Sequence, residues 1–187
     1  MRLKRLLLFL AILVTLPSGI LIVMPVSGDD HRHRNRHRER RQNDDHGRGN
    51  LNPVSDSTYK DKCGACHSPY QPELLPSASW RRILDRPDDH FGESFELDEQ
   101  SRKTILGYVE INAAEHSAAK LPVTIMRCLG KQVPMRISEI PYIKRKHHDI
   151  SPATIKHQSI GSLSNCTACH TRANEGIYDD DFVAIPE

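Results

Sequence analysis

The chain has 187 residues, enough for one small domain or two very small ones. Its formal net charge of +2 is set by its N-terminal part, because residues 51–187 contain 16 lysines and arginines against 19 aspartates and glutamates, a net of −3. Since this part is mildly acidic and lacks a basic aromatic surface, we expect no nucleic-acid partner.

Residues 1–28 are interpreted as a signal peptide. A positively charged start precedes an apolar stretch over residues 6–26, and small residues follow where signal peptidase prefers them. The apolar stretch is nearly long enough to cross a bilayer, so the alternative is an uncleaved anchor that associates the protein with the inner membrane. Either way the remainder is predicted to be exported to the periplasm.

Residues 29–51 are expected to form a disordered linker rich in His and Arg. Residues 29–50 contain no apolar side chain that could join a core. A weak metal-binding or anion-binding patch is the alternative, because clustered imidazoles bind zinc, copper or nickel. No fixed spacing or cysteine supports a defined site there, so its histidines are not assigned as ligands.

Two copies of the pattern Cys-X-X-Cys-His dominate the rest of the chain, at residues 63–67 and 166–170. This pattern is the attachment site of a c-type haem: two cysteines bond to the porphyrin, and the next histidine becomes the proximal iron ligand. We therefore predict two covalently bound haem c groups with His67 and His170 as proximal ligands. The predicted attachment residues are Cys63, Cys66, Cys166 and Cys169.

Structural zinc and thioredoxin-like dithiols are the competing interpretations of these cysteine pairs. Zinc ribbons usually bring their two pairs within about twenty residues, whereas here about a hundred separate them. Neither alternative requires a histidine after each pair. Haem attachment also agrees with export, because c-type cytochromes mature on the outer side of the bacterial inner membrane.

Residues 52–120 are expected to form a first haem-bearing lobe. A short helix over 55–68 carries the first motif, and an extended proline-containing segment follows it. A second short helix ends before Pro87. The strongest helix is predicted over 98–118, where apolar residues recur at helical spacing.

Residues 121–187 are expected to form a second lobe of similar size. The stretch 120–134 is predicted to be irregular, with prolines near both ends. Short helices are predicted from Ser138 and from Ser151, and a helix from Ser164 carries the second motif and stops at Gly176. The predicted fold is therefore mainly α, with two small haem-bearing lobes and little or no sheet.

Each iron has a second axial position, and the group there decides between electron transfer and ligand chemistry. His116, among polar neighbours late on a predicted helix, is interpreted as a surface residue. The unpaired Cys128 is interpreted as a small buried hydrophobe, with a reactive or intermolecular thiol as the alternative. The other candidate ligands outside the linker are His90, His147, His148, His157, Met126 and Met135.

Over residues 58–186 the chain resembles the bacterial dihaem cytochrome c family. The resemblance extends beyond the two haem motifs, which makes it more specific than the motifs alone. The further matching segments are Tyr70 to Trp80 with Glu73-Leu74-Leu75-Pro76-Ser77, Asp89-His90-Phe91-Gly92-Glu93, Asn112-Ala113-Ala114, Arg136-Ile137-Ser138, His147, Asn165, Ala173, Gly176 and Ile185-Pro186.

This resemblance implies a cytochrome c-like helical fold and two low-spin haems, each with two histidine ligands. The residues that match the distal ligands are His90 and His147, and the neighbouring His148 competes for the second position. Pairing His90 with the first haem and His147 with the second follows from lobe proximity, and a swap across the lobes is the alternative. The implied redox partners are a membrane b-type cytochrome and a small soluble haem protein.

The predicted function is electron transfer between redox partners in the periplasm, without enzymatic activity. Two alternatives keep one labile axial site: a haem enzyme such as a small reductase or peroxidase, and a haem-based redox or gas sensor. The enzyme is disfavoured because both haems leave no room for a separate substrate domain. The sensor is disfavoured because we expect no output domain.

Overall fold

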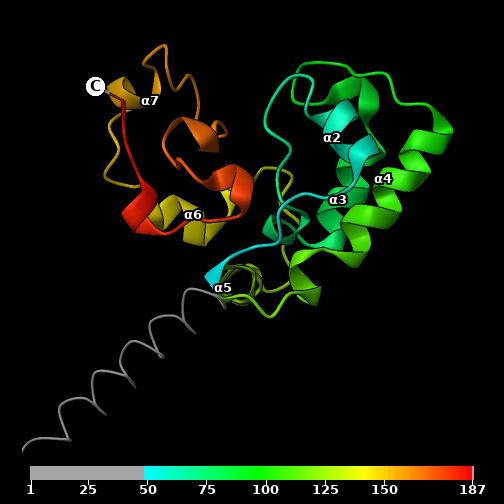
Figure 1. Ribbon diagram of the computed structural model, residues 1–187, viewed down its shortest axis with the longest axis horizontal. Helices are drawn as coiled ribbons and strands as arrows, with labels where there is room; N and C mark the ends of the chain where they lie inside the picture. Colours follow the sequence, from blue (N-terminus) through cyan, green and yellow to red (C-terminus); the bar gives the residue numbers. More distant parts are fainter. Residues whose placement is uncertain (1–48, 187) are drawn as a thin grey trace, which may run out of the picture. The chain divides into compact units, whose positions relative to one another are not determined.

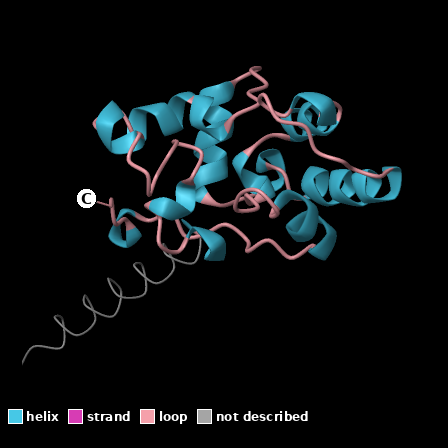
Figure 2. Ribbon diagram, turned by 90° about the horizontal axis from the view of Figure 1, so that it is seen from above, coloured by secondary structure: helices cyan, strands magenta, loops and turns pink. Residues whose placement is uncertain are grey.

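The computed structural model describes residues 49–186, so the predicted signal peptide and most of the predicted linker lie outside the described residues. Over this range the chain forms α-helices and 3₁₀ turns joined by loops (Figures 1 and 2). The only β-type pairings among the described residues are isolated bridges, His90 with Glu93 and His170 with Val183. The prediction of a mainly α fold without a sheet is confirmed. Within residues 49–186, no helix is long and apolar enough to cross a membrane.

Three helices pack together around the first motif: α2 (Ser57–Cys63), α3 (Ser77–Leu84) and α4 (Glu99–Ile111) (Figure 1). Aspartates cap the N-termini of α2 and α4. The Asp56 carboxylate accepts a hydrogen bond from the Tyr59 amide at 2.7 Å, and the Asp98 carboxylate accepts one from the Ser101 amide at 2.8 Å. Helix α4 ends earlier than residue 118, and a 3₁₀ turn follows it.

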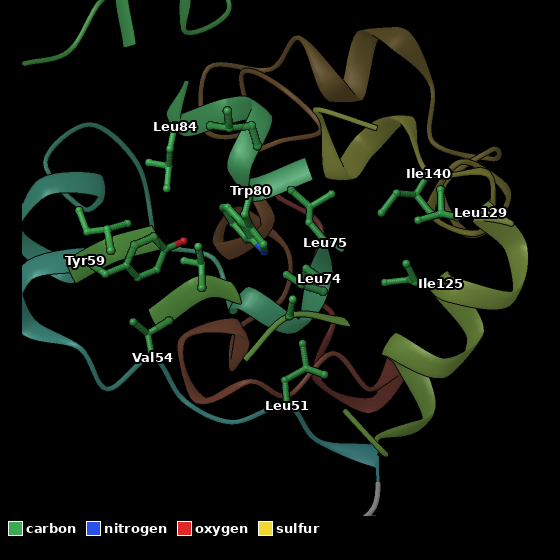
Figure 3. Packing of buried hydrophobic residues seen from close by; sticks show 14 residues of the cluster. Leu51, Val54, Tyr59, Leu74, Leu75, Trp80, Leu84, Ile125, Leu129 and Ile140 are labelled. Atoms are coloured by element: carbon green, nitrogen blue, oxygen red, sulfur yellow. The ribbon is translucent and has the colours of Figure 1, made fainter. Parts of the chain in front are cut away.

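The hydrophobic core lies between these helices and continues toward α5 (Lys120–Leu129). Figure 3 shows Trp80 at its centre, with Tyr59 on one side and Ile125 on the other. The Trp80 indole donates to the carbonyl oxygen of Pro72 at 2.8 Å, so this polar group is satisfied although it is buried. The core residues labelled in Figure 3 are Leu51, Val54, Tyr59, Leu74, Leu75, Trp80, Leu84, Ile125, Leu129 and Ile140.

The prediction of an irregular segment over residues 120–134 was wrong for its first ten residues, because they form α5. Pro122 lies in the first turn of α5, where a missing amide hydrogen costs no helical hydrogen bond. Ile125 and Leu129, four residues apart, are both buried against the core. The burial of apolar side chains on one face of α5 therefore outweighed the helix-breaking tendency of the prolines, which lie near the two ends of the segment.

The second half contains two shorter helices, α6 (Pro141–Lys146) and α7 (Pro152–Ile155). Ser151 caps α7 as predicted, since its side chain accepts from the Thr154 amide at 3.0 Å. Ser138 does not cap α6, because a 3₁₀ turn over Ile137–Glu139 precedes that helix.

The second motif does not lie on an α-helix as predicted, but on a 3₁₀ turn over Cys166–Ala168. The His170 amide donates to the Cys166 carbonyl oxygen at 2.8 Å within the motif, and the end of the motif and the residue after it bond to the C-terminal segment. The Ala184 amide donates to the carbonyl oxygen of Cys169 at 2.8 Å, and the Thr171 amide donates to that of Phe182 at 3.0 Å. The sequence pattern could not show these two hydrogen bonds, because their partners are more than ten residues away along the chain.

Gly176 connects the segment after the second motif to the beginning of the described chain at Leu51. Its carbonyl oxygen accepts from the amide of buried Leu51 at 2.9 Å, and its φ of +79° lies in the left-handed region. A Cβ at this position would lie 2.2 Å from the Leu51 carbonyl oxygen. Gly176 therefore ends the 3₁₀ turn over Ala173–Glu175, as predicted, and also allows close backbone contact.

We predict that Gly176→Ala lowers the free energy of unfolding of the haem-loaded protein by about 3 kcal/mol or more, because it adds a backbone collision to the left-handed strain of about 1–2 kcal/mol. Gly161→Ala is the matched control, since Gly161 has φ +73° but open space around its Cβ position. Denaturant titration should show the smaller loss for the control. Equal losses in the two variants would contradict the close contact at Leu51.

Candidate functional site

The structure brings His67 and His90 together although 23 residues separate them in the chain. Their ring centroids are 6.2 Å apart and their ring planes are 16° from parallel. His67 lies four residues after the end of α2, and Gly64, which caps that helix, lies so close to the Lys60 carbonyl oxygen that a Cβ would be 2.2 Å from it. Residues 64–66 form a turn after the helix, and His67 lies opposite His90.

His90 lies on a tight loop between α3 and α4. Its amide donates to the Glu93 carbonyl oxygen at 2.7 Å, and the Glu93 amide donates back at 3.3 Å. Phe91, between them, has a φ of +63°, which is strained for a bulky side chain. The Arg136 guanidinium lies 4.0 Å from the centre of the Phe91 ring and covers it. A contact from the second half of the chain thus holds the loop that carries His90.

A cavity of about 530 Å³ lies between His67 and His90 and is also lined by Cys63 and Cys66. Its volume falls within the range of about 300–1,000 Å³ that is usual for cofactor sites. Burial raises the pKa of the Cys63 thiol to about 11, so the free thiol keeps its proton near neutral pH. The other walls are mainly apolar and include Leu75, Trp80, Ile83, Leu84, Phe95 and Ile105.

The structure also brings His147 and His170 together, with ring centroids 6.0 Å apart and ring planes at 65°. His147 lies directly after α6, and His170 ends the second motif. The adjacent His148 is largely exposed, and its Nε2 lies 3.0 Å from the Asp149 carboxylate. Of the two neighbouring histidines, His147 is the one that faces His170.

Both separations fit one iron atom between two imidazoles. An imidazole nitrogen lies about 2 Å from a metal that it ligates, with the ring centre about 1.2 Å further, so two imidazoles on opposite sides have centres about 6.4 Å apart. The observed 6.2 Å and 6.0 Å agree with this value. Met135 also lines the first cavity, but His90 faces His67. His116 is exposed, in agreement with its interpretation as a surface residue.

Backbone carbonyl groups orient one imidazole of each pair. Nδ1 of His67 lies 2.8 Å from the Ser68 carbonyl oxygen, and Nδ1 of His147 lies 2.8 Å from that of Ile143. Each contact requires the proton on Nδ1, so the lone pair of Nε2 is free to bind a metal. Burial and the facing imidazole lower the pKa of His90 and of His170, which favours the neutral form that ligates iron.

Sequence reasoning missed two aromatic residues that contact the proximal histidines. The Tyr70 ring lies 5.0 Å from the His67 ring, and the Tyr178 ring lies 5.4 Å from the His170 ring. Tyr70 follows the first motif by three residues, a proximity that the sequence does display. Tyr178 shows no such signal, because its position depends on the fold of the C-terminal segment.

Two solved structures resemble this chain closely. A dihaem cytochrome c from Rhodobacter sphaeroides is 39% identical with a TM-score of 0.60, and the match covers 70% of this chain and 100% of that one. A dihaem type c cytochrome from Shewanella baltica OS155 is 33% identical with a TM-score of 0.57, over 70% of this chain and 92% of that one. No curated protein matches the chain.

The family model described as dihaem cytochrome c matches residues 59–178, which includes both motifs and both histidine pairs. The chain belongs to the dihaem cytochrome c family. It therefore carries two covalently attached haem c groups, and its broad class is that of haem-based electron carriers.

We predict that one haem is bound through Cys63 and Cys66 and the other through Cys166 and Cys169. Protein matured in a periplasm, denatured and digested, should yield two haem-bearing peptides in mass spectrometry, each with one motif. A motif peptide without haem, or a haem lost on acid extraction, would contradict the assignment. Cys128 is the internal control, since its peptide should carry no added mass.

Proposed function

We propose that this protein is a periplasmic dihaem electron carrier in which both haems are low-spin and have two histidine ligands. His67 and His90 would ligate the first iron, and His170 and His147 the second. The observation that carries the proposal is that the fold brings two imidazole pairs to 6.2 Å and 6.0 Å, each pair containing one motif histidine.

Bound haem supplies an iron that changes oxidation state by one electron, without making or breaking bonds to substrate. The protein side chains would hold that iron in a fixed coordination. His67 and His170 are fixed by their covalent motifs, while His90 depends on its tight loop and His147 on the end of α6. With an imidazole on both faces, neither iron would have a vacant position for dioxygen, peroxide or nitrite.

The proposed partners are redox proteins, with a membrane b-type cytochrome as donor and a small soluble haem protein as acceptor. The sequence features behind the periplasmic location are the apolar stretch over residues 6–26 and the two haem motifs. If the leader is retained, the protein stays at the inner membrane near such a donor.

Removing either distal imidazole should leave one axial position of one iron vacant. His90→Ala and His147→Ala are each expected to convert one haem to a high-spin centre that binds carbon monoxide, while the other haem keeps its low-spin spectrum. Optical spectra of the ferrous protein with and without carbon monoxide measure this. Each variant should change about half of the total haem absorbance.

Two histidines offer matched controls for these variants. His116→Ala and His148→Ala remove exposed imidazoles close in sequence to α4 and α6, and both should leave the spectra unchanged. A spectral change in His148→Ala together with none in His147→Ala would show that His148, and not His147, is the distal ligand of the second haem. An unchanged spectrum in His90→Ala would show that the first assignment is wrong.

An electron carrier and a haem enzyme can be told apart by whether the protein turns over a small substrate. With both axial positions filled, the wild-type protein should reduce a small oxidised haem protein rapidly and show no turnover of peroxide, nitrite or hydroxylamine above that of a free haem peptide. Stopped-flow oxidation and steady-state assays on one preparation measure both properties. Substrate turnover well above the haem peptide would favour the reductase or peroxidase.

A further inference from the structure

The two distal histidines lie in segments of opposite charge. Residues 85–119, which carry His90, contain three lysines and arginines against nine aspartates and glutamates, a net charge of −6. Residues 120–160, which carry His147, contain eight lysines and arginines against two acidic residues, a net charge of +6. The two segments nearly cancel in the net charge of the folded part, so the difference between the two histidine pairs appears only when the segments are compared.

The positive charge of the second segment is concentrated where α5 and α6 pack against each other. The Arg145 guanidinium, in the last turn of α6, lies 3.4 Å from the thiol of Cys128, in the last turn of α5. This contact brings the basic ends of the two helices together. We call the exposed cations there the basic surface, which consists of Arg127, Lys131, Lys144 and Arg145.

The basic surface lacks the acidic neighbours that the first half of the chain supplies. Helix C-termini favour cations in general, because their unpaired carbonyl groups carry a partial negative charge. In the first half such a cation also has an anion beside it, since Arg81 in the last turn of α3 donates to the Glu110 carboxylate at 2.9 Å. No cation of the basic surface forms an ion pair with an acidic side chain among residues 49–186. Cations held close together repel one another, and an anionic surface placed against them would relieve this repulsion.

The basic surface lies beside the second histidine pair. Helix α6 ends at Lys146, and the next residue is His147, whose ring centroid is 6.0 Å from that of His170. A protein bound to the basic surface would therefore approach the second iron from its distal side. The loop that carries His90 is rich in exposed carboxylates over residues 88–96, so it would repel the same protein from the first iron.

We propose that the basic surface is the docking site of an electron-transfer protein with an acidic surface, which exchanges electrons with the second haem. In each exchange one electron leaves the reduced centre of one protein and reduces the oxidised centre of the other. No bond forms or breaks and no proton moves. Complementary charge raises mainly the rate of encounter, by about tenfold or more at low salt. This inference rests on the proposed function of the protein as a dihaem carrier and adds the surface chemistry of one partner.

The test uses the hydroquinone form of flavodoxin, a small acidic flavoprotein that donates single electrons, as the probe for an acidic partner. Stopped-flow absorbance gives the second-order rate constant for its reduction of the ferric, haem-loaded full chain. For the wild type this rate constant should fall about tenfold or more between about 0.01 M and about 1 M ionic strength, because the screening length shrinks from about 30 Å to about 3 Å.

Arg127→Glu and Lys144→Glu each reverse one charge of the basic surface. Both side chains are exposed and form no hydrogen bond or ion pair with the described residues, whereas Arg145 contacts Cys128 and is left in place. Each variant should lower the rate constant about fivefold at low ionic strength and leave it unchanged at high ionic strength. Lys103→Glu is the matched control, because it makes the same change in net charge at an exposed cation on α4. It should lower the rate constant by less than about twofold, and equal slowing in all three variants would overturn the proposal.

Chemical cross-linking locates the contact without any substitution. A carbodiimide joins a lysine amine directly to a neighbouring carboxylate, so the wild-type complex with flavodoxin should yield cross-linked peptides that contain Lys131 or Lys144. Mass spectrometry identifies these peptides. Cross-links confined to lysines outside the basic surface would overturn the proposal; the exposed lysines of the first half that could form them are Lys60, Lys62 and Lys103.

An anionic membrane is the other surface that cations could bind. Sedimentation with phosphatidylglycerol vesicles tests it on the same preparations. Vesicle binding that both Arg127→Glu and Lys144→Glu abolish, together with a flavodoxin rate constant that neither variant changes, would assign the basic surface to lipid and overturn the proposal.

The outcomes separate the docking surface from the proposed function. Carbon monoxide binding or a high-spin haem in the wild type would contradict the carrier itself, while cross-linking would still report where flavodoxin docks. A low-spin wild type that flavodoxin reduces at a rate independent of salt would leave the carrier intact and overturn the docking surface. If one charge-reversal variant loses haem, the other provides the test. If both lose haem, the cross-linked positions in the wild type decide.

Discussion

The distance between two facing imidazoles is the constraint on which the rest of this structure depends. A metal held between two histidines requires their ring centres to lie about 6.4 Å apart, and the chain comes close to this distance twice with residues from separate segments. The supporting features serve the same end: the turn at Gly64, the strained loop around Phe91 and the end of α6 each place one imidazole. The apolar cavity beside the first pair gives a porphyrin the surface that it needs.

The two sites are built differently. The imidazole planes of the first pair are nearly parallel, whereas those of the second are 65° apart. Of the two motif histidines, His67 has the Ser68 carbonyl oxygen as an acceptor for Nδ1, but Nδ1 of His170 is buried without a hydrogen-bond partner among the described residues. A carbonyl acceptor raises the basicity of an imidazole ligand, and burial changes the potential of the iron. The surroundings of the two histidine pairs are therefore not equivalent.

The sequence revealed the cofactor and the helical class because these depend on local patterns. The doubled motif needs only five consecutive residues, and the cap at Ser151 needs four. Features that depend on distant partners could not be predicted in the same way. The helix over Lys120–Leu129 was missed because burial of Ile125 and Leu129 outweighed its proline. The second motif lies on a 3₁₀ turn, and its end bonds to the distant C-terminal segment. The division into lobes over 52–120 and 121–187 stays a prediction, as do the ligand assignments.

The most direct measurement is the near-infrared magnetic circular dichroism of the ferric, haem-loaded wild-type protein. The energy of its charge-transfer band identifies the pair of axial ligands on each low-spin iron without any substitution. The arrangement of His67 with His90 and of His147 with His170 predicts bands of the two-histidine type alone, with an intensity that accounts for both haems. A band of the histidine–methionine type, which Met135 beside the first cavity could produce, or a high-spin signal from either haem would contradict it.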